Sequence, residues 1–168
     1  TDLINKCNNE ITNNSYRCLF VDATIYSSIF IDVNIEVSHI ISHINESIEI
    51  YKSLKIPLPK KLILKTAINA DFIHQVSKIR ALKGLIVQLF KVHKEGIEIQ
   101  LECSYNDSLL SPVEKENNLL RMTTAFLVAI ISGANGIELT DLLAIKKGEY
   151  WQKIITNIPI ILLEESQL

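Results

Sequence analysis

Two side chains that could take part in chemistry follow the first apolar run of the chain. Asp22 and Thr24 come just after Cys18 to Val21, a run that predicts a buried strand. Enzymes built on parallel sheets or barrels place their catalytic groups beyond the C-terminal ends of the strands. Asp22 and Thr24 are therefore the best-placed candidates for a site, but one carboxylate without a partner does not define a reaction.

The histidines are candidates for metal binding. His39 and His43 are four residues apart, as two ligands on one helix face would be, but no HExxH arrangement accompanies them. The apolar residues around them predict that both point away from the core, into solvent. The other histidines and the three cysteines show no ligand spacing, so we expect neither a metal site nor a disulfide framework: His74, His93, Cys7, Cys18 and Cys103.

Three further features are better explained by structure than by chemistry. The adjacent carboxylates Glu164 and Glu165 would point about 100° apart on a helix, so we expect a solvated helix end. The pair Tyr150-Trp151 predicts an aromatic anchor for the last helix. The segment Gly133 to Gly136 lies between a helix and a strand, the reverse of the order in phosphate-binding loops. No residue is therefore expected to be catalytic or to bind a cofactor.

Four strand-like runs alternate with helical periodicities and must position these side chains. This alternation predicts an α/β fold with about four strand–helix units and parallel strands, half of an eight-unit barrel. A doubly wound open sheet fits the same order, and the pattern alone does not choose. The runs are Cys18 to Val21, Leu62 to Leu64, Ile97 to Cys103 and Gly136 to Leu139. Helices are expected near residues 33–51, 70–89, 111–131 and 148–163, with another before the first run at 1–12.

The composition of the chain argues against several classes of protein. The 168 residues suffice for one domain, and the hydrophobic fraction of 48% argues against disorder. A net charge of −2 without a basic patch argues against a nucleic-acid partner. The first residues lack the apolar core of a signal peptide, and no apolar run approaches the roughly 20 residues of a membrane helix. We therefore expect a cytoplasmic protein with no membrane partner.

Several segments, in order along the chain, match motifs of one family. Asp22-Ala23-Thr24-Ile25-Tyr26 is similar to a D-A-T-x-Y strand end, and Glu36-Val37 stands where a helix bears Glu-Leu. The helix from Phe72 to Leu82 resembles F-x-x-E-I-A-K-x-R-A-L, with Gln75 in place of the glutamate. Further matches are Ser104 and Asn106 to T-S-x-x-N, and the runs from Asn118 to Arg121 and from Asn157 to Ser166. Together these segments resemble methylmalonyl-CoA mutases, in particular the second half of the small-subunit barrel.

The resemblance implies a fold and a setting. In that family a TIM barrel binds the acyl-CoA and is joined to a cobalamin-binding domain, and adenosylcobalamin interconverts succinyl-CoA and methylmalonyl-CoA by radical chemistry. Residues 1–168 would form a single domain, the C-terminal half of such a barrel. The family-matching positions are Asp22, Thr24, Tyr26, Lys78, Arg80, Ser104, Asn118 and Arg121.

The chain departs from the active pattern at the positions that carry chemistry. Thr24 and Ile25 stand where the active subunit has a Tyr-His pair, and Ala125 replaces a glutamate beside the cofactor. Phe30 and Ile31 replace a Gly-Ala pair, and the lower-ligand D-x-H-x-x-G motif is missing. The resemblance thus implies a non-catalytic small-subunit-like component that binds no cofactor by itself. Its partner would be a catalytic large subunit, giving a heterodimer, or a second copy.

Two alternatives stay open. The chain could be one part of an active isomerase, or a free-standing α/β binding module that has lost the chemistry. A half-barrel would leave two strand edges and its inner face uncovered, and that face would be carried by strands such as Leu62 to Leu64. We therefore expect the isolated chain not to be a stable lone monomer.

Overall fold

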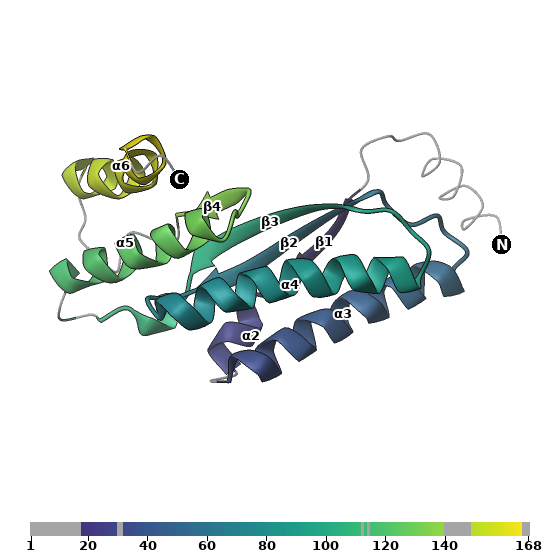
Figure 1. The fold of residues 1–168 in the computed structure, drawn as a ribbon. Helices are drawn as coiled ribbons and strands as arrows, with labels where there is room; N and C mark the ends of the chain where they lie inside the picture. The colour runs from purple at the N-terminus through teal and green to yellow at the C-terminus, as the bar shows by residue number, and fades with distance from the viewer. Residues whose placement is uncertain (1–17, 30–31, 112, 114, 140–148, 166–168) are drawn as a thin grey trace.

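The computed structural model describes residues 18–29, 32–111, 113, 115–139 and 149–165 (Figure 1). Its elements follow the predicted order, with an additional short helix after the first strand. They are β1 (Cys18–Asp22), α2 (Thr24–Ile29), α3 (Val33–Ser53), β2 (Lys61–Ile68), α4 (Phe72–Val92), β3 (Glu98–Tyr105), η1 (Asp107–Leu109), α5 (Lys115–Ile131), β4 (Gly136–Glu138) and α6 (Glu149–Glu165). The helix expected at 1–12 lies outside the described residues, as do Pro112 and Glu114 at the start of the helix expected at 111–131.

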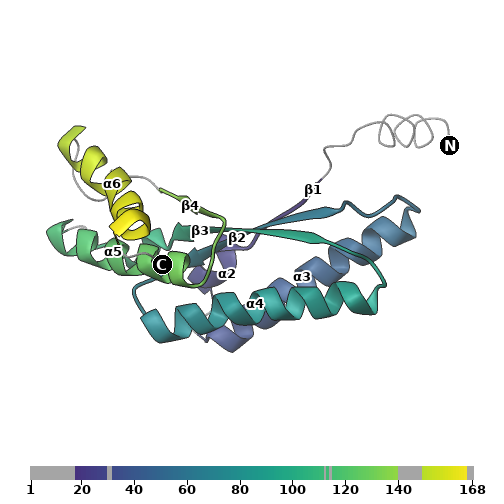
Figure 2. The same cartoon turned by 45° about the horizontal axis from the view of Figure 1, so that its top comes forward.

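The four described strands form one sheet in which every pairing is parallel. Their order is β1-β2-β3-β4, so each strand lies beside its neighbour in the sequence. Helices α3 and α4 lie side by side along one face of the sheet, and α5 and α6 continue the row (Figures 1 and 2). This confirms the predicted α/β class with four strand–helix units.

The strand order bears on the choice that the sequence pattern left open. A doubly wound sheet reverses its strand order at one point, and its ligands bind in the crevice formed there. The described strands run in consecutive order without a reversal, with α3 and α4 on a single face (Figure 2). This is the winding of a barrel segment, and equally that of one half of a Rossmann-type sheet.

The core lies between the sheet and the helix row. Alternate strand residues point into it, among them Leu62 and Leu64 of β2 and Leu101 and Cys103 of β3, all fully buried. Ile63 points to the opposite face, where it is half-buried. The strand from Leu62 to Leu64 therefore turns both leucines toward the helices and contributes only Ile63 to the other face, because residues alternate between the two faces of a strand.

Helices α2 and α3 each begin beside a carboxylate that accepts a hydrogen bond from a backbone N–H group. Asp32 caps α3, and its side chain accepts a hydrogen bond from the backbone N–H of Asn34 at 2.7 Å. Asp22 accepts from the backbone N–H of Thr24 at 3.0 Å, at the start of the unexpected helix α2. Asp71 is the N-cap residue of α4, as Asp32 is of α3, but its side chain makes no capping hydrogen bond. Among the described helices, none combines the length and apolar composition needed to cross a membrane.

Candidate functional site

The face of the sheet opposite the helix row, here called the open face, carries mainly polar side chains. No described element covers it (Figure 2). Strand register places its residues in rows, so that Asp22, Lys65 and Glu102 lie on adjacent strands. Two ion pairs cross the face, Lys61–Glu98 at 3.6 Å and Lys65–Glu138 at 2.5 Å. The polar composition is typical of a solvated face, and the dry core of a barrel interior is instead filled by branched apolar residues.

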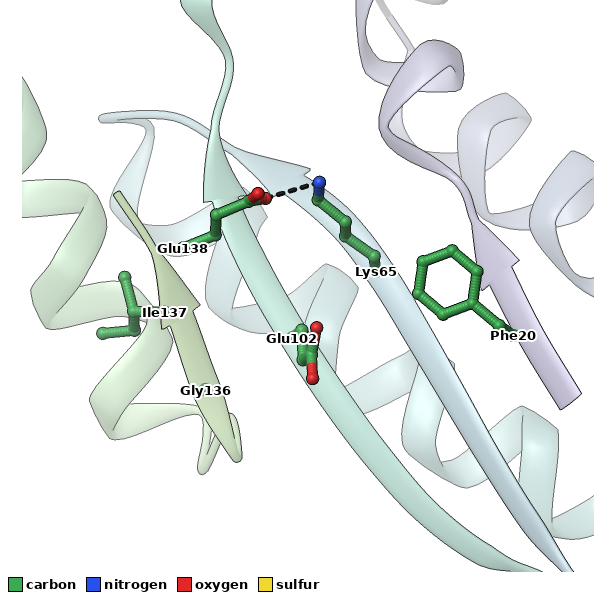
Figure 3. Close-up of a pocket in the computed structure, with 6 residues that line it drawn as sticks. All are labelled: Phe20, Lys65, Glu102, Gly136, Ile137 and Glu138. Carbon is green, nitrogen blue, oxygen red and sulfur yellow. Dashed lines mark ion pairs between the residues drawn. The ribbon is translucent and has the colours of Figure 1, made fainter. Parts of the chain in front are cut away.

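A cavity of about 420 Å³ opens on this face toward the C-terminal ends of the strands. All four strands contribute to its lining: Phe20, Lys65, Glu102, Gly136, Ile137 and Glu138. Figure 3 shows the Lys65–Glu138 ion pair reaching from β2 to β4 over β3, with the Phe20 ring on β1 directed toward Lys65. Gly136 adds no side chain here, and a Cβ at that position would lie 3.6 Å from Cγ of Glu102.

The charges around the cavity act on one another. The hydrogen bond to Glu138 raises the pKa of Lys65, and Glu138, Asp22 and Glu102 add to this by electrostatic attraction, although burial opposes it. Burial alone would raise the pKa of Asp22. The hydrogen bonds from Thr24 and the positive charge of Lys65 outweigh burial, and that pKa is lowered. Lys65 is thus held as a cation and Asp22 as an anion.

Asp22 and Thr24 lie together, as their spacing suggests. The Thr24 hydroxyl donates to Oδ1 of Asp22 at 2.7 Å, so the Asp22 carboxylate is engaged in holding the start of α2. Tyr26 lies two residues after Thr24 on α2, and its hydroxyl lies 3.2 Å from Nδ1 of His43 on α3. These contacts hold the start of α2 and join α2 to α3.

A buried ion pair that no sequence pattern had indicated joins α3 to α4. Nζ of Lys78 donates to Oε1 of Glu36 at 3.1 Å and to the backbone carbonyl of Ala67, at the end of β2, at 2.6 Å. The Ser27 hydroxyl also donates to Oε1 of Glu36, at 2.6 Å. The Lys78 and Glu36 side chains are 0% and 4% exposed. Burial lowers the pKa of Lys78, while the attraction of Glu36 opposes that shift.

The other family-matching positions do not converge on a single site. Arg80 is exposed on α4, and Ser104 is buried near the end of β3. Asn118 is fully buried on α5, where it accepts from Nη1 of Arg121 at 3.0 Å and bonds to the backbone of Ser111. The positions thus lie apart from one another, at the end of β1 and on α2, on α4, near the end of β3, and on α5.

The histidines only partly match expectation. His39 is exposed as predicted, but His43, also on α3, is half-buried and its ring contacts the ring of Tyr26. His93 is also half-buried, and its Nε2 lies 3.0 Å from Oδ1 of Asn45, which links α4 to α3. Within the described part of the chain, no three His, Cys, Asp or Glu side chains are grouped so as to hold a metal ion.

The ends of the last helix match the sequence-based reading in part. Glu164 and Glu165 are exposed. Trp151 packs against the core, whereas Tyr150 is 70% exposed and contacts Trp151 edge-on. Helix α6 continues through Pro159 without a break.

Comparison with known proteins adds no family to these observations. No family model matches the chain, and no curated protein matches it. The functional argument therefore rests on the residues and their geometry.

Proposed function

We propose that this chain is a non-catalytic, small-subunit-like component of a cobalamin-dependent methylmalonyl-CoA mutase. It acts as the structural partner of a catalytic subunit, in the cytoplasm, and binds no adenosylcobalamin by itself. The observation that carries the proposal is the Glu36–Lys78 pair. Two positions that resemble the family's helices meet in the core, where they hold α3, α4 and the end of β2 together.

A structural role is also favoured by the residues at the positions where the family's active subunit carries its chemistry. Ala125, in place of a glutamate, is fully buried on the core side of α5. Thr24 is engaged with Asp22, and Ile25 is an exposed apolar side chain. None of these three side chains supplies a general acid or base, which favours a structural role over an isomerase that is active through this chain.

Mixing the chain with a mutase catalytic subunit from the same source tests the proposal. We expect a stable complex by size-exclusion chromatography with light scattering, and no turnover of succinyl-CoA by this chain alone with adenosylcobalamin. Ile161→Asp, at an exposed apolar position of α6, should weaken the complex. Val92→Asp, at an exposed position on the outer helix α4, is the matched control. Turnover by the isolated chain, or failure to bind any such subunit, would contradict the proposal.

The second candidate is a free-standing α/β binding module, and the cavity on the open face favours it. The charged side chains in its lining suit a small polar ligand, and a solvated sheet face needs no partner subunit. A monodisperse monomer that binds small molecules but no mutase subunit would support this candidate over the first.

A further inference from the structure

The open-face cavity holds more negative charge than its lysine neutralises. Lys65 is committed to Glu138 at 2.5 Å, while Asp22 and Glu102 act on the same ammonium group only at longer range. The half-buried Glu102 accepts a hydrogen bond from Nε2 of Gln100 at 3.0 Å. No described cation lies within ion-pair distance of the Glu102 carboxylate. A positive group entering the cavity would therefore gain favourable electrostatic energy from Glu102 and Asp22.

The aromatic ring of Phe20 lies on the other side of Lys65. It is 54% exposed on β1 and faces the cavity (Figure 3). The face of an aromatic ring attracts cations and packs against apolar stems. Adjacent strands are about 4.8 Å apart, so Phe20 on β1 and Glu102 on β3 are separated by roughly 10 Å across the sheet. That span suits a short extended molecule with a charged head and an apolar stem.

We propose that this cavity binds a small organic cation, with an ammonium or guanidinium head near Glu102 and its stem against Phe20. An anion would meet the carboxylates of Glu102 and Glu138, while Lys65, the lysine of the described lining, is already paired. A divalent metal ion would need several donors in one place, and the described side chains provide no such group. The site does not depend on the proposed mutase assembly, because all its lining residues belong to this chain.

Titration of the 168-residue chain with agmatine tests the site. Agmatine carries a guanidinium and an ammonium on a four-carbon stem. We expect saturable shifts of the backbone amide resonances of Phe20, Lys65, Glu102 and Glu138, with a dissociation constant of about 1 mM or tighter. Succinate, a dianion of similar length, should leave these resonances unchanged. Absence of saturable shifts, or equal binding of succinate, would overturn the proposal.

Matched variants identify which carboxylate and which ring contribute to agmatine binding. Glu102→Gln keeps the shape of the side chain and should weaken agmatine binding about fivefold or more. Glu98→Gln removes a carboxylate from the same strand face outside the cavity and should change binding less than about twofold. Phe20→Leu keeps apolar volume without the aromatic face and should weaken binding about threefold. Equal losses in the Glu98 and Glu102 variants would show non-specific attraction and would overturn the site.

Discussion

The ammonium of Lys78 on α4 lies 3.1 Å from Oε1 of Glu36 on α3, and both side chains are withdrawn from solvent. The same ammonium bonds to the backbone carbonyl of Ala67 at 2.6 Å, so one lysine links two helices to the sheet. Burying two charges costs desolvation energy that only good geometry and further hydrogen bonds offset. The Ser27 hydroxyl supplies such a bond to Glu36, at the start of the helix row.

Breaking this pair should be strongly destabilising. Lys78→Met leaves Glu36 as an unpaired buried charge, and we expect a loss of about 3–5 kcal/mol in the free energy of unfolding. Urea denaturation followed by circular dichroism measures this loss. Lys91→Met, at an exposed position on the same helix, is the control and should change stability by less than about 0.5 kcal/mol.

The double variant tests whether the ion pair itself stabilises the protein, or whether each charge is needed only because its partner is buried. Glu36→Leu combined with Lys78→Met removes both charges, and we expect it to recover most of the stability lost in Lys78→Met alone. A double variant as unstable as the sum of the two single variants would contradict this expectation, because the two charges would then act independently.

The two aspartates at helix starts form a matched test of capping. Asp32 bonds to the N–H of Asn34 at 2.7 Å, whereas Asp71 makes no side-chain capping bond. Asp32→Ala should therefore destabilise the protein by about 1 kcal/mol. Asp71→Ala loses only an exposed contact with His74 and should cost clearly less. Equal losses in urea denaturation would contradict the assignment of Asp32 as the cap.

The sequence pattern predicted the element order well because alternation of apolar residues depends on local periodicity. The period-two run from Ile97 to Cys103 predicts a strand with one polar face, and Gln100 and Glu102 do alternate with the buried Leu101 and Cys103. The spacing of the apolar residues between Phe72 and Leu89 predicts the buried side of α4, and its centre is confirmed, because Ile79, Leu82 and Ile86 are fully buried. The prediction is wrong only for Phe72, which is exposed, and it lacks Gln75 and Lys78, which are polar in type but also buried.

The buried ion pair of Glu36 with Lys78 and the open-face cavity were not predicted from the sequence, for one physical reason. A buried lysine is identified only by its partner, and Glu36 lies 42 residues earlier in the chain. Sequence periodicity records the character of single residues and not their long-range pairing. The open-face cavity was missed for the same reason, because it requires the register that places Asp22, Lys65 and Glu102 on adjacent strands.

The thiol of Cys103 should influence stability at alkaline pH. Burial raises the pKa of Cys103 to about 12, although Lys78 and Lys83 oppose the shift. An unfolded cysteine ionises near pH 8.5, so between that pH and about 12 the unfolded state binds fewer protons than the folded state. The Cys103 contribution to stability is therefore complete below about pH 8.5 and declines as pH rises, by at most about 1.4 kcal/mol per unit.

The measurement must separate Cys103 from Lys78, whose lowered pKa acts with the opposite sign. We expect the stability difference between the unchanged chain and Cys103→Ala to shrink from pH 8.5 to 10.5 in urea denaturation. Cys18→Ala, which replaces the exposed cysteine of β1, is the matched control variant. A difference that is constant with pH would mean that the Cys103 thiol ionises equally in both states.

The isolated chain should associate with a second copy or with a partner. In the described sheet β1 and β4 are edge strands, and unpaired edges favour association. The C-terminal half of α6 is apolar on several sides, with Ile160, Ile161 and Leu163 about half exposed, and helices that are apolar all round are normally covered. The open face is polar and gives little reason to associate, so we place the contact at the sheet edges and on α6.

Light scattering of the purified chain should give a mass above 19.0 kDa. Ile161→Glu should lower that mass, and Val92→Glu on α4 should not. A monodisperse monomer with a cooperative melt would instead mean that this half-wound sheet is complete without a partner.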